Sequence, residues 1–186
     1  MSRLLATLFL VLAAGAARAA PAPSWAVDKA ASQIRFVSSY EGTAFSGGFS
    51  RWDAAIRFDP ANLAGSSVTA SIDVGSVATG DQDRDQALPT DTFLAAARFP
   101  RASFTAHAFK ALGHGRYEAI GALSLRGVTR PLTLPFTLAI NGGEARMNAA
   151  IGLDRLAFGV GQKEWRSTAT VPAQVQVTIA ITARRR

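Results

Sequence analysis

The sequence predicts a mainly β protein, an elongated eight-stranded antiparallel barrel with a short helical insertion around residues 81–98. Apolar and polar residues alternate along eight segments, which is typical of strands with one buried face. Short connections join these segments, so neighbouring strands should run antiparallel. The segment 128–140 would span about 40 Å at roughly 3.3 Å per residue, which suits a tall barrel better than a sandwich.

The first predicted strands lie between residues 34 and 74. Segment 34–39 places Phe36 inward, segment 52–58 places Trp52, Ile56 and Phe58 on one face, and segment 68–74 follows with the same alternation. Phe49 falls on the opposite parity from Trp52. We therefore expect a β-bulge near residues 50 and 51.

Residues 76–100 interrupt the strands, and the sequence predicts two short helical pieces there. Thr79 followed by Gln82 matches a capping box, and a helix should start near Asp81. Asp91 is a second N-cap candidate before an alanine-rich run. Pro100 disfavours helical geometry at the preceding residue, so the second piece should end there.

Five further strands are expected, at 102–107, 117–125, 128–140, 147–153 and 171–181. Asn141-Gly142 is a strong hairpin signal between the third and fourth of them. All five keep one apolar face, so a single core should lie inside the sheet.

The N-terminal residues predict export to the periplasm. Arg3, the apolar run 4–14 and Ala17-Arg18-Ala19 form the three parts of a cleavable signal peptide, covering residues 1–19. This run has eleven residues, ten of them apolar, and falls short of the roughly 20 needed to span a bilayer. Residues 20–186 should then form one domain.

The amino-acid composition limits the classes of site and partner that this protein can have. The chain has no cysteine, which removes thiol chemistry and cysteine metal sites. The net charge of +7 falls to +5 without Arg3 and Arg18, and three of those charges belong to the C-terminal Arg184-Arg185-Arg186. We expect no nucleic-acid partner, whereas contact with a membrane surface or a membrane protein stays open.

The sequence contains no catalytic motif that we recognise. His107 and His114 lack a third metal ligand, and the spacing of Asp81, Asp83 and Asp85 fails as a calcium loop because Gln86 replaces the required glycine. We therefore expect no metal and no catalytic residues. Inward aromatic and aliphatic side chains are abundant instead and either fill the core or line a ligand lumen: Phe36, Trp52, Ile56, Phe58, Phe93, Phe104, Leu123, Leu134, Phe136, Phe158 and Trp165.

Several motifs, in order, resemble the YceI-like family of exported, polyisoprenoid-binding, lipocalin-like proteins. The strongest runs from Gly121 to Leu132 and follows the family order G-x-L-T-L-x-G-V-T-x-P, and Asp154-Arg155 with Phe158-Gly159 matches the late element N-R-x-x-F-G. The chain departs from the family at Ser38-Ser39-Tyr40-Glu41, where a histidine is common, and at Asp154, where asparagine is usual.

The resemblance implies a lipocalin-like barrel that carries a long isoprenoid, such as a polyprenyl phosphate or a quinone, in an apolar lumen without catalysis. The bound lipid would be the only expected ligand, with no cofactor. Arg126 and Arg130 are candidate headgroup contacts, whereas Arg84 and Arg155 either join them or pair with local aspartates, Arg84 with Asp85.

Two alternative functions stay open. One is an enzyme at the barrel mouth that uses carboxylates such as Asp73, Asp85 or Asp91 on a lipid. The other is a structural or partner-binding module with a filled barrel. The carrier itself could form a homodimer, since a second copy could shelter a protruding tail.

Overall fold

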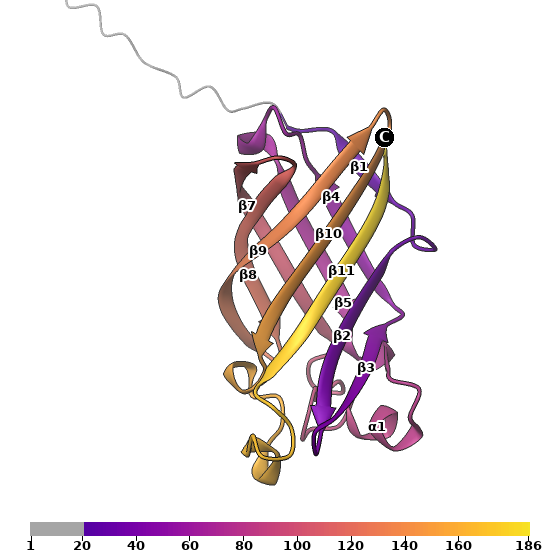
Figure 1. The fold of residues 1–186 in the computed structure, drawn as a ribbon, viewed down its shortest axis with the longest axis vertical. Coiled ribbons are helices and arrows are strands. Elements are labelled where there is room, and N and C mark those ends of the chain that lie inside the picture. The colour runs from indigo at the N-terminus through magenta and orange to yellow at the C-terminus, as the bar shows by residue number, and fades with distance from the viewer. Residues whose placement is uncertain (1–20) are drawn as a thin grey trace, which may run out of the picture.

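A single antiparallel sheet closes into a tall barrel in the computed structural model, which describes residues 21–186 (Figure 1). The predicted signal peptide lies outside the described residues. The strands are β1 (Ser24–Val27), β2 (Gln33–Tyr40), β3 (Thr43–Phe49), β4 (Trp52–Arg57), β5 (Ser67–Asp73), β6 (Val77–Ala78), β7 (Arg101–Gly113), β8 (Arg116–Leu125), β9 (Val128–Asn141), β10 (Glu144–Asp154) and β11 (Gln174–Arg185).

These segments make eight barrel strands, as predicted. β1 with β2, β3 with β4, and β5 with β6 are each two halves of one strand, interrupted by a bend or a short 3₁₀ turn. Consecutive strands pair, and β11 closes the ring by pairing with both β1 and β2. The closed ring leaves few free backbone edges, which a small all-β domain must otherwise protect.

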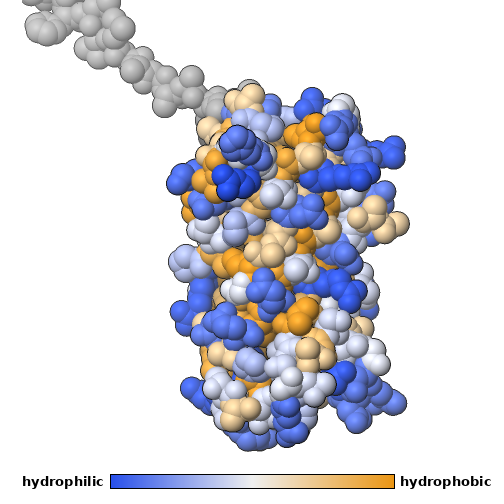
Figure 2. All heavy atoms as spheres, in the orientation of Figure 1, coloured by the Kyte–Doolittle hydropathy of each residue, from blue (hydrophilic) through white to orange (hydrophobic). Residues whose placement is uncertain are grey.

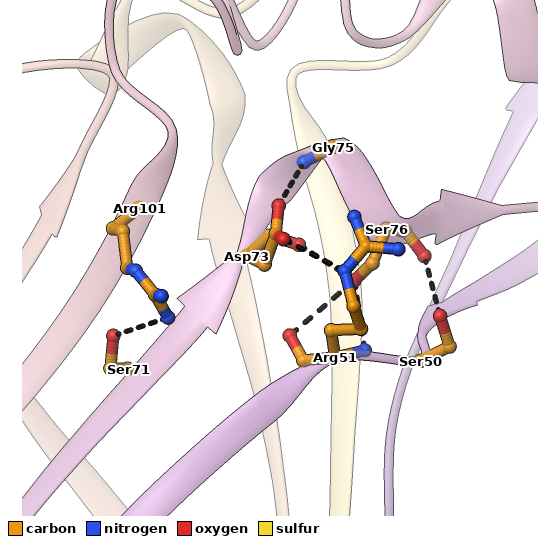
Figure 3. Close-up of polar contacts among 7 residues, drawn as sticks. All are labelled: Ser50, Arg51, Ser71, Asp73, Gly75, Ser76 and Arg101. Carbon is orange, nitrogen blue, oxygen red and sulfur yellow. Dashed lines mark hydrogen bonds and ion pairs between the residues drawn. The ribbon is translucent and has the colours of Figure 1, made fainter.

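The strand breaks between β3 and β4 at Ser50 and Arg51, where the sequence predicted a bulge, and the partner strand is interrupted opposite this point by the 3₁₀ turn Val74–Ser76. Figure 3 shows the polar contacts that hold this corner. The Arg51 backbone N–H donates to the Ser76 hydroxyl at 3.0 Å, and that hydroxyl donates to the Asp73 carbonyl at 2.7 Å. Phe49 and Trp52, on either side of this hydrogen-bonded corner, both line the barrel cavity.

The insertion contains one α-helix rather than two helical pieces. α1 covers Gln82–Ala87, and its N-cap is Asp81, whose carboxylate accepts from the Arg84 N–H at 3.0 Å. The prediction of a capping box at Thr79 is wrong. Thr79 lies outside the helix, and its backbone N–H and its hydroxyl both donate to the Asp85 carboxylate.

Residues 88–99 form turns, so the second predicted helical piece is wrong. The Thr90 carbonyl accepts from both Phe93 and Ala95, and Ala95 has φ of +51°. Leu94 and Ala95 are almost fully buried against the barrel end. Burial of these side chains overrides the helix preference of the alanine run.

Two apolar clusters share the barrel interior. One centres on Val74, Phe104, Leu123 and Phe158, and the other on Trp25, Phe58 and Ile181. α1 and the connection 155–173 lie at one end of the barrel, whereas the C-terminus lies at the other (Figure 1). Within residues 21–186, no helix is long and apolar enough to cross a membrane.

Candidate ligand-binding site

The barrel encloses a cavity of about 700 Å³. Its walls are mostly apolar side chains that point inward from the strands, because every second residue of each strand faces the lumen. Figure 2 shows the contrast on the outside, where hydrophilic residues are scattered over the visible face with apolar ones between them. The polar residues that line the cavity are Ser38, Tyr40, Arg57, Ser67, Asp81, Asp83, Arg84 and Arg155.

All eleven residues proposed for the lumen line this cavity: Phe36, Trp52, Ile56, Phe58, Phe93, Phe104, Leu123, Leu134, Phe136, Phe158 and Trp165. Seven of them lie in strands, Phe58 directly follows β4, and the connections supply Phe93, Phe158 and Trp165. Their contact with a ligand stays a prediction. The volume is typical of a small-molecule or lipid site rather than of a packing defect.

Aromatic rings fill the barrel end that carries the chain termini. The Phe58 ring packs edge-on against Phe109, Tyr117 and Phe136 at centroid distances of 5.3, 5.4 and 5.8 Å. Trp25 donates from its indole N–H to the Phe58 carbonyl at 2.9 Å. These contacts form a well-packed aromatic cluster at this end of the lumen.

Polar and aromatic side chains mix at the opposite end, beside α1. Trp165 lies 5.2 Å from Phe93 and 6.1 Å from Tyr40, measured between ring centroids. The Arg84 guanidinium stacks over the Phe45 ring at 4.8 Å. We call Ser38, Tyr40, Phe45, Arg84, Phe93 and Trp165 the head pocket.

Arg84 pairs with Asp81 at 3.4 Å, so the predicted pair with Asp85 is wrong. The Asp85 carboxylate instead accepts from both the backbone N–H and the hydroxyl of Thr79, each at 2.7 Å. The Thr79 hydrogen bond lowers the pKa of Asp85 below its usual range. Helix α1 thus presents Asp81, Asp83 and Arg84 to the cavity, two carboxylates to one guanidinium.

Arg155 is buried at 6 % exposure, and its contacts differ from the predicted pairing with an aspartate. Its guanidinium donates to the carbonyls of Pro172, Val160, Ser167 and Val171 at 2.8 to 3.3 Å. Burial lowers the pKa of Arg155, although an arginine still stays charged at neutral pH. The side chain ties the connection 155–173 together over the barrel end.

Arg126 and Arg130 are not among the residues that line the cavity. Arg126 donates to the Asp91 carbonyl at 2.6 Å, and Arg130 donates to the Ala157 carbonyl at 2.7 Å. Both guanidiniums brace the connections at this end. The structure therefore does not bring the two proposed headgroup arginines to the site.

The three carboxylates proposed for catalysis do not converge on the cavity either. Asp73 accepts from Arg51 at 2.8 Å and from the Gly75 N–H at 3.0 Å (Figure 3), and the Arg51 contact lowers its pKa. The Asp85 carboxylate accepts hydrogen bonds from Thr79. Among residues 21–186, no group of three or more His, Cys, Asp or Glu side chains is placed to hold a metal ion.

Sequence reasoning missed Tyr40 and Phe45 as cavity residues. Tyr40 continues the inward parity of Phe36 and Ser38, so the alternation of β2 could have revealed it. Phe45 lies in β3, where Gly47 and Gly48 concealed the strand pattern.

Comparison with known proteins identifies the family of this chain. Residues 25–183 match the family model described as the YceI-like domain. The chain belongs to the YceI-like family. It is 39 % identical to a UPF0312 protein of Yersinia pestis over 98 residues, which are 53 % of this chain, and it spans only 50 % of the length of that relative.

Solved structures of two other proteins share this barrel. Burkholderia cenocepacia BcnA is 31 % identical, with a TM-score of 0.81 over 84 % of this chain and 98 % of BcnA. A polyisoprenoid-binding domain from Saccharophagus degradans has a TM-score of 0.70 over 88 % of this chain and 99 % of that domain. Its identity of 18 % makes it a likeness of fold alone.

Proposed function

We propose that this YceI-like protein binds a long-chain isoprenoid lipid in the barrel lumen and carries it in the periplasm without chemical turnover. The observation that carries the proposal is the apolar cavity of about 700 Å³, which has the Phe58 aromatic cluster at one end. The Saccharophagus degradans domain, which shares this barrel and is named for polyisoprenoid binding, supports the same class of ligand.

The physical chemistry of the lumen favours a hydrocarbon chain. Each five-carbon unit removed from water contributes about 4 kcal/mol at roughly 0.8 kcal/mol per buried carbon. Several units therefore exceed the cost of association, estimated at about 4 to 15 kcal/mol. The tail would enter first and lie against the Phe58 end, with the head beside α1.

The cavity argues against the filled-barrel alternative, since a module packed with its own side chains would not leave such a space. The enzyme alternative loses the carboxylates that were proposed for it, because Asp73, Asp85 and Asp91 do not line the cavity. Export is part of the proposal and depends on the N-terminal pattern of residues 1–19.

Native mass spectrometry of the mature protein tests the proposal. We expect a bound mass that is lost on denaturation and is recovered by organic solvent as an isoprenoid lipid. Phe136→Asp should abolish retention because it buries an unpaired charge in the lumen. Thr137→Asp, on the exposed side of β9, is the matched control and should retain the lipid. A delipidated wild-type protein that takes up no added isoprenoid would contradict the proposal.

A further inference from the structure

Four arginines surround β1 at the barrel end that carries the C-terminus (Figure 1). β1 lies between β4 and β11, and Arg57 of β4 pairs in register with Ser24 on one side of it. Arg184 and Arg185 of β11 pair with the other side of β1. The Arg186 backbone N–H donates to the Ser24 carbonyl at 3.0 Å. We call Arg57, Arg184, Arg185 and Arg186 the arginine cluster.

No carboxylate neutralises the arginine cluster within residues 21–186. All four side chains are exposed, and none of them takes part in an ion pair between described residues. Arg57 donates to the Ala22 carbonyl at 3.3 Å, and the Arg185 guanidinium lies over the Trp25 ring at 5.3 Å. Both contacts leave the positive charge uncompensated.

Glu144 is the acidic residue that pairs in register with the cluster, opposite Arg184. Its carboxylate instead accepts from the Arg146 guanidinium at 2.8 Å. Like charges gathered around one short strand repel one another, which costs stability. An anionic partner would relieve that repulsion.

The positive charge of the molecule is concentrated at this end. The chain without Arg3 and Arg18 carries a net charge of +5, and the cluster holds four uncompensated cations. At the opposite end, helix α1 presents Asp81 and Asp83 beside Arg84. A charge distribution of this shape turns the end around β1 toward a negative surface.

An exposed apolar side chain accompanies the cations at this end. Leu112, in the β7–β8 hairpin, is 37 % exposed. Arg116, at the start of β8, adds another exposed cation to the same hairpin. Apolar side chains flanked by cations suit contact with a bilayer, because the apolar group enters the headgroup layer while guanidiniums bind phosphates.

We propose that the arginine cluster docks the barrel, by the end around β1, onto the surface of a bilayer that contains anionic phospholipids. A bilayer is an extended anionic plane, so it meets the strand ends and the β7–β8 hairpin at the same time. The guanidiniums bind headgroup phosphates, and Leu112 enters the headgroup layer. This orientation directs the head pocket away from the bilayer. The inference goes beyond the proposed function and does not depend on which molecule occupies the lumen.

Co-sedimentation of the mature protein with phosphatidylcholine vesicles, with and without about 30 % phosphatidylglycerol, tests the docking. We expect binding to the anionic vesicles alone, and loss of that binding when the ionic strength rises from about 0.05 M to about 0.5 M, because the Debye length shortens.

The double variant Arg184→Gln with Arg186→Gln should weaken binding to the anionic vesicles about tenfold or more, the scale of two cations near anionic lipid. Lys163→Gln with Arg166→Gln is the matched control, because it removes the same charge from exposed side chains at the opposite end of the barrel. This control should weaken binding less than about threefold, since distant charges are screened.

Leu112→Ser should weaken vesicle binding about twofold to fivefold, the effect of one partly buried apolar side chain, and leave the salt dependence unchanged. Unaltered binding in this variant would overturn the entry of Leu112 into the headgroup layer. Equal losses in the two double variants would overturn the location of the docking surface, because binding would then follow net charge alone.

A wild-type protein that does not bind the anionic vesicles would overturn the docking itself. Binding of polyglutamate without binding of the vesicles would do the same and would assign the arginine cluster to an acidic protein partner. None of these outcomes bears on the carrier proposal, which depends on lipid retained in the lumen.

Discussion

Arg155 shows how one side chain can hold a whole connection. It is the only charged residue among residues 21–186 with less than a tenth of its surface exposed. Gly161 makes room for it, because a Cβ at that position would lie 2.2 Å from an Arg155 terminal nitrogen. The φ of +85° at Gly161 also favours glycine. Together the two residues fold the 3₁₀ turns of residues 155–166 over the cavity.

Arg155→Ala should lower the free energy of unfolding by about 3 kcal/mol, because four carbonyls lose their donor and a space opens beneath them. Urea unfolding measures this loss. Arg130→Ala is the matched control, since the exposed Arg130 side chain reaches one carbonyl, and it should cost less than about 1 kcal/mol. Equal losses in the two variants would contradict the clamp role of Arg155.

Asp73 and Asp85 make the stability of the folded protein depend on pH in the acidic range. The contact with Arg51 lowers the pKa of Asp73, and the contact with Thr79 lowers the pKa of Asp85, both from an ordinary value of 3.8. In each case the native state binds fewer protons than the unfolded state near pH 4. The stabilising contribution is therefore complete above the unfolded pKa and is lost as the pH falls through the native pKa.

Asp85→Asn should flatten the dependence of melting temperature on pH below about pH 4 while lowering the melting temperature at pH 7. Thermal unfolding at a series of pH values, followed by circular dichroism, compares the variant with the wild-type protein. Parallel curves for the two proteins would show that the Thr79 contact does not stabilise the charged carboxylate.

At the scale of elements, β7 and β8 approach each other unusually closely at Gly121. A Cβ there would lie 2.1 Å from the Thr105 carbonyl oxygen and 2.8 Å from the Ala106 Cβ. The register of the pair shifts between Ala106 and Ala108, so a bulge lies beside this contact. A glycine in a strand often marks such an approach of two backbones.

Gly121→Ala should cost about 2 kcal/mol or more in unfolding free energy, because the two strands must separate to admit the methyl group. Gly143→Ala in the β9–β10 turn is the control, since a Cβ there meets nothing within 4 Å. Chemical denaturation of both variants provides the comparison, and a neutral Gly121→Ala would mean that the bulge relaxes freely.

At the scale of the whole molecule, the lumen lowers the stability of the fold but leaves space for a ligand. A cavity of this size forfeits packing contacts that a filled core would make. Ala54 and Ala70 face each other across β4 and β5 on the lumen side and leave part of that space. The empty volume is what gives a hydrocarbon tail its place.

Ala54→Phe should fill part of the lumen, lower isoprenoid affinity at least tenfold and leave the delipidated protein within about 1 kcal/mol of the wild-type stability. Lipid titration together with urea unfolding of the delipidated protein measures both quantities. Ala55→Phe, one residue along and outward on β4, should bind lipid normally. Unchanged affinity in Ala54→Phe would place the tail away from this wall.

The sequence by itself determined the eight barrel strands in outline and the eleven inward side chains that line the cavity, but it missed the strand segments β1, β3 and β6. A period of two is local information, and a barrel forces every inward residue toward one axis. Asp81 as the start of α1 was local in the same way, since a cap depends on residues three apart.

Only the tertiary structure decided the rest of the site. Residues 88–99 follow the burial of Leu94 and Ala95 rather than their helix propensity. Arg84 pairs with Asp81 rather than Asp85, and Arg155 donates to carbonyls rather than to an aspartate. In each case the folded connections determine which acceptors lie within reach of the guanidinium. Whether a cavity forms depends on how all the strands close together, so the alternation alone left both a filled core and a ligand lumen open.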